Sequence, residues 1–141
     1  SSKWALAEID FLESLELKSS SPQVLNYLAY GWLEKNLHLD RALQMLQKAY
    51  AGNPNSYYIL DSLAWAYYKN NNLDKAVQLM EEVISLAPGE AISLDHLGDI
   101  YFALNRKREA SYLWKQAKDL AEPDENITES LEKKLEEYYA G

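Results

Sequence analysis

Apolar residues recur at helical spacing along most of the chain, in segments that short polar turns interrupt. The interruptions carry residues that end helices, at Gly52-Asn53-Pro54, Asn70-Asn71-Asn72 and Pro88-Gly89. Each apolar segment is long enough for three or four helical turns and shows none of the alternation that a half-buried strand requires. The pattern predicts an all-α chain of short helices joined by tight turns.

The apolar pattern repeats every 34 residues. This shift places the residues Leu60, Leu63, Ala64, Tyr67, Ala76, Met80 and Val83 on Leu94, Leu97, Gly98, Tyr101, Ala110, Trp114 and Ala117. The reverse shift places Asp74, Ala76, Met80, Val83 and Pro88 on Asp40, Ala42, Leu46, Ala49 and Pro54. Three repeats are therefore predicted, at 22–55, 56–90 and 91–123, and the first has one extra residue in the turn around Asn36-Leu37-His38.

Each repeat has the same order of residue sizes: a bulky apolar residue, Leu with a small residue, an aromatic, then Ala, a bulky residue, a small residue and Pro. This order resembles the tetratricopeptide repeat (TPR) motif over residues 22–123. The resemblance implies a right-handed superhelix of antiparallel helix pairs. The small residues Ala64 and Gly98 are expected where the two helices of a pair approach each other, because bulky side chains would wedge them apart.

Two segments flank the three repeats. Residues 1–21 place Trp4, Phe11 and Leu15 at helical spacing, which predicts one helix of a partial preceding repeat. Residues 124–141 place Ile127, Leu131, Leu135 and Tyr138 on one stripe of an otherwise charged segment. A C-terminal capping helix with a polar outer face is expected there.

Composition narrows the functional classes. The formal net charge is −8, and the longest basic run is Arg106-Lys107-Arg108, so nucleic acid is not expected as a partner. The chain has no cysteine, which excludes thiolate zinc sites and cysteine nucleophiles and leaves the redox compartment open. No stretch reaches the roughly 18 apolar residues that a membrane span needs, and the N-terminus lacks the basic-then-apolar pattern of a signal peptide.

The TPR resemblance also implies where a partner would bind. The first helices of the pairs line a concave groove, and the residues that the motif leaves free point into it. The candidate partner-binding residues are Asn26, Tyr27, Tyr30, Tyr58, Asp61, Trp65, Tyr68, Asp95, Asp99 and Phe102. Tyr and Trp offer rigid contact area with a polar handle, and the carboxylates suit a partner with basic residues. The alternative is that these aromatic rings only pack between neighbouring helices.

One known ligand of TPR proteins is disfavoured by this groove. The carboxylate clamp that grips chaperone C-termini uses Lys, Asn and Arg side chains, and the matching positions here hold Asn26, Tyr30, Ser62, Ile92 and His96. The clamp is absent, and Asp95 and Asp99 would repel an acidic tail.

The sequence contains no clear metal site or catalytic motif. Asp95, His96 and Asp99 lie within one helical turn, but two carboxylates and one imidazole make an incomplete metal shell. His38 lies in a turn, and neither histidine has a nucleophile in a recognisable motif. We expect no metal, no cofactor and no enzyme activity.

Three five-residue segments resemble those of a subset of bacterial TPR proteins. They are Asn26-Tyr27-Leu28-Ala29-Tyr30, Asp61-Ser62-Leu63-Ala64-Trp65 and Asp95-His96-Leu97-Gly98-Asp99. This resemblance implies a bacterial source and leaves the cytoplasm and the periplasm or envelope both open. Two functional hypotheses follow. The chain is either a protein-interaction module that binds a peptide or helix of a partner, or a structural spacer or self-association segment of a longer TPR protein, including a homo-oligomer.

Overall fold

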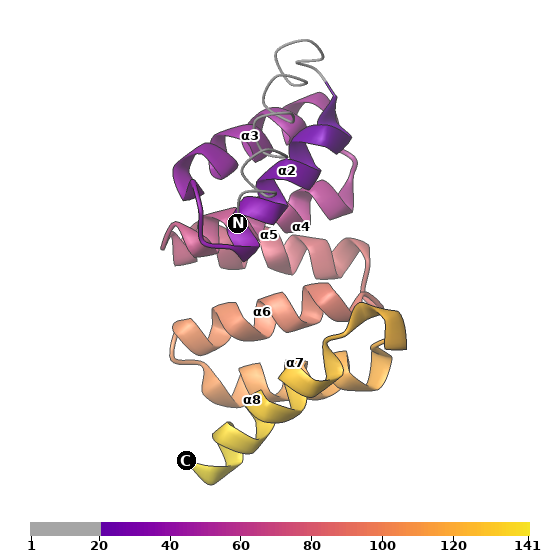
Figure 1. The fold of residues 1–141 in the computed structure, drawn as a ribbon. Helices are drawn as coiled ribbons and strands as arrows, with labels where there is room; N and C mark the ends of the chain where they lie inside the picture. Colours follow the sequence, from indigo (N-terminus) through magenta and orange to yellow (C-terminus); the bar gives the residue numbers. More distant parts are fainter. Residues whose placement is uncertain (1–20) are drawn as a thin grey trace, which may run out of the picture. The chain divides into compact units, whose positions relative to one another are not determined.

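The computed structural model describes residues 21–141, and every regular element in this part of the chain is a helix (Figure 1). The helices are α2 (Pro22–Glu34), α3 (Leu39–Gly52), α4 (Tyr57–Lys69), α5 (Leu73–Leu86), α6 (Ala91–Ala103), α7 (Lys107–Leu120), the 3-10 helix η1 (Pro123–Glu125) and α8 (Thr128–Ala140). The prediction of an all-α chain is confirmed. The helix predicted within 1–21 lies outside the described residues.

The described residues fall into two compact units, which divide between Asn71 and Asn72. In the first unit, α3 packs against both α2 and α4, and α2 also contacts α4. In the second unit, α6 packs against both α5 and α7, and α8 packs against α7. The predicted boundaries of the repeats, 22–55, 56–90 and 91–123, stay predictions, although the helices begin and end close to the turns on which they were based.

The turns within the predicted pairs use asparagine in the left-handed region. Asn71 and Asn105 have φ values of 66° and 64°, at equivalent positions of two three-residue turns. Asparagine tolerates this conformation better than most residues with a side chain. The first turn contains one more residue and has two left-handed positions, Asn36 and His38, so the extra residue lies where the sequence indicated.

In the second unit, α6 and α7 pack closely because Gly98 has no side chain. A Cβ atom built at Gly98 would lie 2.4 Å from Nε1 of Trp114 and 2.5 Å from its Cδ1. The indole of Trp114 is buried and occupies the space that a side chain at position 98 would need. The equivalent positions of the first unit hold Ala29 and Leu46, both fully buried. The unit with the larger residue on the second helix, Trp114 instead of Leu46, thus has the smaller residue on the first helix, Gly98 instead of Ala29.

A tyrosine contact recurs at the same register in the two units. In the first unit, Nε2 of Gln47 on α3 donates to the hydroxyl of Tyr67 on α4 at 3.1 Å. In the second unit, the hydroxyl of Tyr101 on α6 donates to Oε2 of Glu81 on α5 at 2.5 Å. The guanidinium of Arg106 lies over the Tyr101 ring at 3.9 Å. Each contact ties a helix to the one before it.

Candidate functional site

The ten residues predicted to bind a partner fall on three helices in two units. Seven of them, Asn26, Tyr27, Tyr30, Tyr58, Asp61, Trp65 and Tyr68, lie on α2 and α4 of the first unit. The other three, Asp95, Asp99 and Phe102, lie on α6 of the second unit.

The aromatic residues of the first unit differ widely in exposure. Tyr27 and Tyr58 expose 65% and 43% of their surface, whereas Trp65 exposes only 6%. The rings of Trp65 and Tyr68 stack at a centroid distance of 4.6 Å and an interplanar angle of 19°. Trp65 and Tyr68 thus form a fixed aromatic pair on α4, and the tyrosines Tyr27 and Tyr58 are the rings that another molecule can reach.

The polar candidates of the first unit are less accessible. Asp61 is buried on α4, and Asn26 is half-buried on α2. The side-chain oxygen of Asn26 is itself buried and accepts no hydrogen bond from the described residues. A buried acceptor without a donor costs about 1–3 kcal/mol.

Asp95 and Asp99 of the second unit both bind the same lysine. Nζ of Lys134, on α8, donates to Oδ1 of Asp95 at 2.7 Å and to Oδ1 of Asp99 at 2.8 Å. Nε1 of Trp114 donates to the same oxygen of Asp99 at 3.2 Å. The lysine Nζ also lies 5.6 Å from the centroid of the Trp114 ring. The sequence predicted these carboxylates as acceptors for a basic group, and in this structure Lys134 is that group.

Burial and charge act against each other in this cluster. Burial alone would lower the pKa of Lys134, but the carboxylates of Asp99 and Asp95 outweigh it and raise that pKa. Burial raises the pKa of Asp99, with a further contribution from Asp95, and the single ammonium of Lys134 does not compensate fully. The cluster therefore holds its lysine charged, while one of its two carboxylates is more easily protonated than an exposed aspartate.

Phe102, at the end of α6, is 41% exposed. Its ring packs against Trp114 at 5.6 Å, and Nζ of Lys107 lies 5.3 Å from the ring centroid. Phe102 thus combines a supporting contact with an accessible surface.

Lys134 is the residue of this cluster that the sequence reasoning missed. It lies on the stripe formed by Ile127, Leu131, Leu135 and Tyr138, at a position where a capping helix normally places an apolar residue. A lysine on a buried stripe predicts a buried carboxylate partner, because an unpaired charge there would be strongly unfavourable. That signal was available in the sequence.

Other kinds of site are not found in the described residues. Within 21–141, no group of three or more His, Cys, Asp or Glu side chains is arranged to hold a metal ion. None of the helices from α2 to α8 is both long and apolar enough to cross a membrane.

Comparisons with known proteins agree with the repeats. Residues 38–95 match the family model described as tetratricopeptide repeat. This matched segment carries tetratricopeptide repeat sequence. No curated protein matches the sequence.

Solved structures share the TPR fold at low sequence identity. MamA RS-1, as its ArsTM double mutant, has a TM-score of 0.71 and 20% identity, with 84% of this chain and 66% of that chain covered. The type III secretion translocator chaperone SycD of Yersinia enterocolitica has a TM-score of 0.73 and 16% identity, with 84% and 92% covered. The first TPR of Spaghetti (RPAP3), bound to the HSP90 peptide SRMEEVD, has a TM-score of 0.69 and 17% identity, with 84% and 90% covered. This chain thus spans just under two thirds of the MamA chain, and identities this low show a shared fold.

Proposed function

We propose that the chain is a protein-interaction module, without enzyme activity, that binds a peptide or helix of a partner protein. The residues proposed for this contact are Asn26, Tyr27, Tyr30, Tyr58, Asp61, Trp65, Tyr68, Asp95, Asp99 and Phe102. The observation that carries the proposal is the row of aromatic side chains on α2 and α4, in which Tyr27 and Tyr58 are exposed. Tyrosine is enriched at protein interfaces relative to the rest of the protein surface.

The comparisons support a binding role. The RPAP3 domain was solved with a bound peptide, and SycD is named as a chaperone of secretion translocators. Both share the fold of this chain. The HSP90 peptide SRMEEVD contains three acidic residues, whereas the residues proposed here include Asp61, Asp95 and Asp99. Opposite charges favour association, so the proposed partner carries Lys or Arg.

The two carboxylates on α6 already have a basic partner within the chain. Asp95 and Asp99 already hold an ammonium group, that of Lys134, at hydrogen-bond distance. A basic residue of a partner would compete with Lys134 for the same oxygens. The first unit, where Tyr27 and Tyr58 are reachable, is therefore the proposed main contact.

A peptide array with graded Lys and Arg content tests the proposal. The double variant Tyr27→Ser/Tyr58→Ser removes the two exposed rings of the first unit, and its affinity for the peptides that wild type captures should fall about tenfold or more. Tyr112→Ser is the matched control, because Tyr112 is as exposed as Tyr27, at 65%, and lies outside the ten residues. Circular dichroism checks that all variants stay helical.

The results separate the two functional hypotheses. Capture of basic peptides by wild type and by Tyr112→Ser, with loss in the double variant, supports the interaction module. Capture that the double variant retains, or no preference for basic over acidic peptides, would contradict the proposed contact. If no peptide binds, the spacer or self-association hypothesis is favoured instead.

A further inference from the structure

The helix α8 takes the place of the first helix of a further pair. At a shift of 34 residues, Leu97, Gly98 and Tyr101 of α6 correspond to Leu131, Glu132 and Leu135 of α8. Leu131 and Leu135 are buried, as Leu97 and Tyr101 are. The inner face of α8 therefore follows the pattern of the repeat.

Glu132 prevents this outer face from receiving another helix in the usual way. Its counterpart Gly98 has no side chain, and the indole of Trp114 fills that space. Glu132 instead places a carboxylate there, with Oε2 at 3.7 Å from Nζ of Lys118 on α7. A helix that packed on α8 as α7 packs on α6 would have to displace or bury this carboxylate, which is unfavourable without a basic partner.

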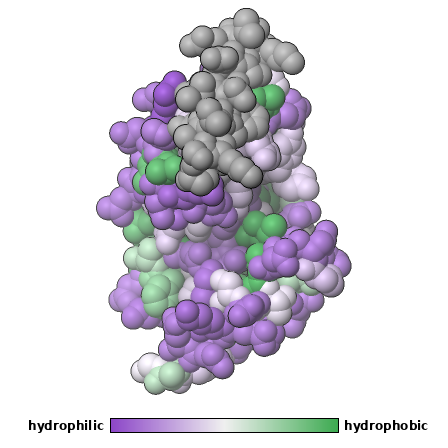
Figure 2. All heavy atoms as spheres, viewed as in Figure 1, coloured by the Kyte–Doolittle hydropathy of each residue, from purple (hydrophilic) through white to green (hydrophobic). Residues whose placement is uncertain are grey.

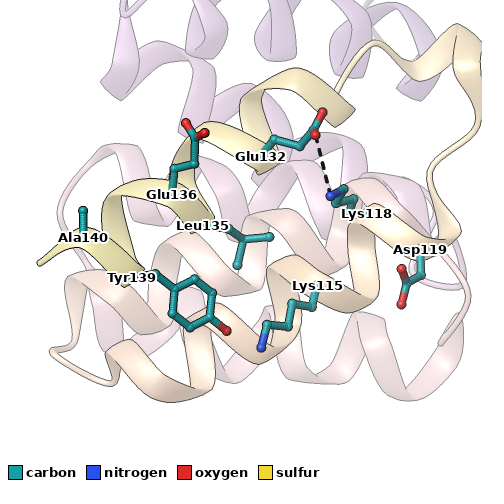
Figure 3. Close-up of a pocket in the computed structure, with 8 residues that line it drawn as sticks. All are labelled: Lys115, Lys118, Asp119, Glu132, Leu135, Glu136, Tyr139 and Ala140. Carbon is teal, nitrogen blue, oxygen red and sulfur yellow. Dashed lines mark ion pairs between the residues drawn. The ribbon is translucent and has the colours of Figure 1, made fainter.

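An open cavity of about 690 Å³ lies at this place, between α7 and α8 (Figure 3). Its apolar lining includes Leu135 and the ring of Tyr139, a residue that is 60% exposed. Figure 3 shows Leu135 directed toward α7 and Glu136 directed away from it. The cavity thus combines an apolar floor with charged edges. On the face shown in Figure 2, hydrophobic residues form small patches among hydrophilic ones.

The charges at the edges are arranged by helix. The α7 edge carries Lys115 and Lys118, and the α8 edge carries Glu132 and Glu136. Asp119, at the end of α7, is the one exception among the charged lining residues. A surface with a basic edge on one helix and an acidic edge on its neighbour is complementary to its own copy after a two-fold rotation.

The existing contacts leave these charges available. Lys118 and Glu132 are 42% and 55% exposed at their side chains, and 3.7 Å is long for an ion pair. Nζ of Lys115 lies 4.9 Å from the ring centroid of Tyr139. Within the described residues, Glu136 takes part in no ion pair. Exposed pairs of this kind contribute little to the fold, so they can be exchanged for intermolecular ones.

We propose that the α7/α8 face binds the same face of a second copy of this chain. In the resulting two-fold pair, Lys115 and Lys118 of one copy face Glu132 and Glu136 of the other, around Leu135 and Tyr139. This contact lies on helices other than those that carry the proposed peptide site and does not depend on that site.

A charge-swap experiment tests this pairing. Variant one, Glu132→Lys/Glu136→Lys, makes both edges basic, and variant two, Lys115→Glu/Lys118→Glu, makes both edges acidic. The wild type is expected to dimerise with increasing concentration in sedimentation equilibrium, and more weakly at high salt. Each variant alone should dimerise at least about tenfold more weakly, because four attractive pairs become repulsive. An equimolar mixture of the two variants should dimerise again, as a mixed pair detected by native mass spectrometry.

Single changes at adjacent positions provide the control. Glu136→Lys changes a cavity residue and should weaken the dimer, whereas Glu137→Lys makes the same charge change outside the cavity and should not. Circular dichroism identifies any variant that fails to fold. If a double variant does not fold, the comparison of Glu136→Lys with Glu137→Lys tests the dimer contact instead. A wild type that stays monomeric, variants that dimerise as wild type does, or a mixture that does not regain the dimer would each overturn the proposal. The last outcome would favour a basic helix of another protein as the occupant.

Discussion

In the first unit, Gln47 donates a hydrogen bond to Tyr67, and in the second unit Tyr101 donates one to Glu81 at the same register. The donor and acceptor roles are reversed, and a neutral amide is replaced by a carboxylate. The tyrosine of the second unit responds to this change. Burial and the hydrogen bond to Glu81 raise the pKa of Tyr101 to about 12.

The same contrast holds for helix packing and for buried charge. The first unit has Ala29 where the second has Gly98, and Leu46 where the second has Trp114. The second unit also contains the cluster of Asp95, Asp99 and Lys134. The repeat thus fixes which positions are in contact, while the residue types at those positions differ between the two units. The stability of the second unit should depend more on pH than that of the first.

The largest expected effect comes from removing the ammonium group of the second unit. Lys134→Met keeps the length of the side chain but leaves Asp95 and Asp99 without their partner, and should lower the free energy of unfolding by about 3 kcal/mol. Urea unfolding followed by circular dichroism measures the loss. Lys133→Met, at an exposed neighbouring position, is the control and should change stability by less than about 0.5 kcal/mol.

The pH dependence of this loss has a defined direction. The pKa of Lys134 is raised in the folded state, so its contribution is complete at neutral pH and is lost as pH rises through that pKa. The pKa of Asp99 is also raised, so protonation of Asp99 favours the folded state as pH falls. The deficit of Lys134→Met should therefore shrink as pH is lowered into the carboxylate range. A deficit that stays constant with pH would show that the carboxylates are not its cause.

The sequence predicted the helices, the turns and the close approach at Gly98, because these depend on local residue size and on the 34-residue period. It did not predict which aromatic rings of the candidate site are buried. Trp65 is buried while Tyr58 on the same helix is exposed, although both are large aromatic residues. The partner of Asp95 and Asp99 was missed because Lys134 lies 39 and 35 positions away from them along the chain.

The second prediction concerns helix packing. Gly98→Ala places a methyl group against Trp114, at a position where a Cβ would lie 2.4 Å from Nε1. Overpacking of this kind costs about 3 kcal/mol, and the better helix propensity of alanine returns about 1 kcal/mol, so a net loss of about 2 kcal/mol is expected. The double variant Gly98→Ala/Trp114→Leu rebuilds the Ala29 and Leu46 combination of the first unit. In thermal unfolding, the double variant should lose less stability than the sum of the losses of the two single variants. Losses that simply add would contradict a steric cause.

The third prediction exchanges the tyrosine partners. Glu81→Gln should lower stability by about 1 kcal/mol at neutral pH and lower the pKa of Tyr101 toward its ordinary value. The raised pKa means that Tyr101 stabilises the fold below pH 10.0 and that this contribution is lost as pH rises toward about 12. Tyrosinate absorbance, compared with that of Tyr101→Phe, follows the titration. An unchanged titration of Tyr101 in Glu81→Gln would show that burial alone raises its pKa.

The smallest effect is expected where the two units are most alike. Asn71 and Asn105 hold equivalent left-handed positions, with φ values of 66° and 64°, and neither side chain donates or accepts a hydrogen bond within the described residues. Asn71→Ala and Asn105→Ala should each cost about 0.5 kcal/mol, because alanine tolerates this conformation less well. Asn71→Gly and Asn105→Gly should cost little or nothing, since glycine adopts it freely. Equal losses in urea unfolding would show that the backbone of the turn is a shared element of the repeat. Unequal losses would mean that the chemical difference between the units extends to their turns.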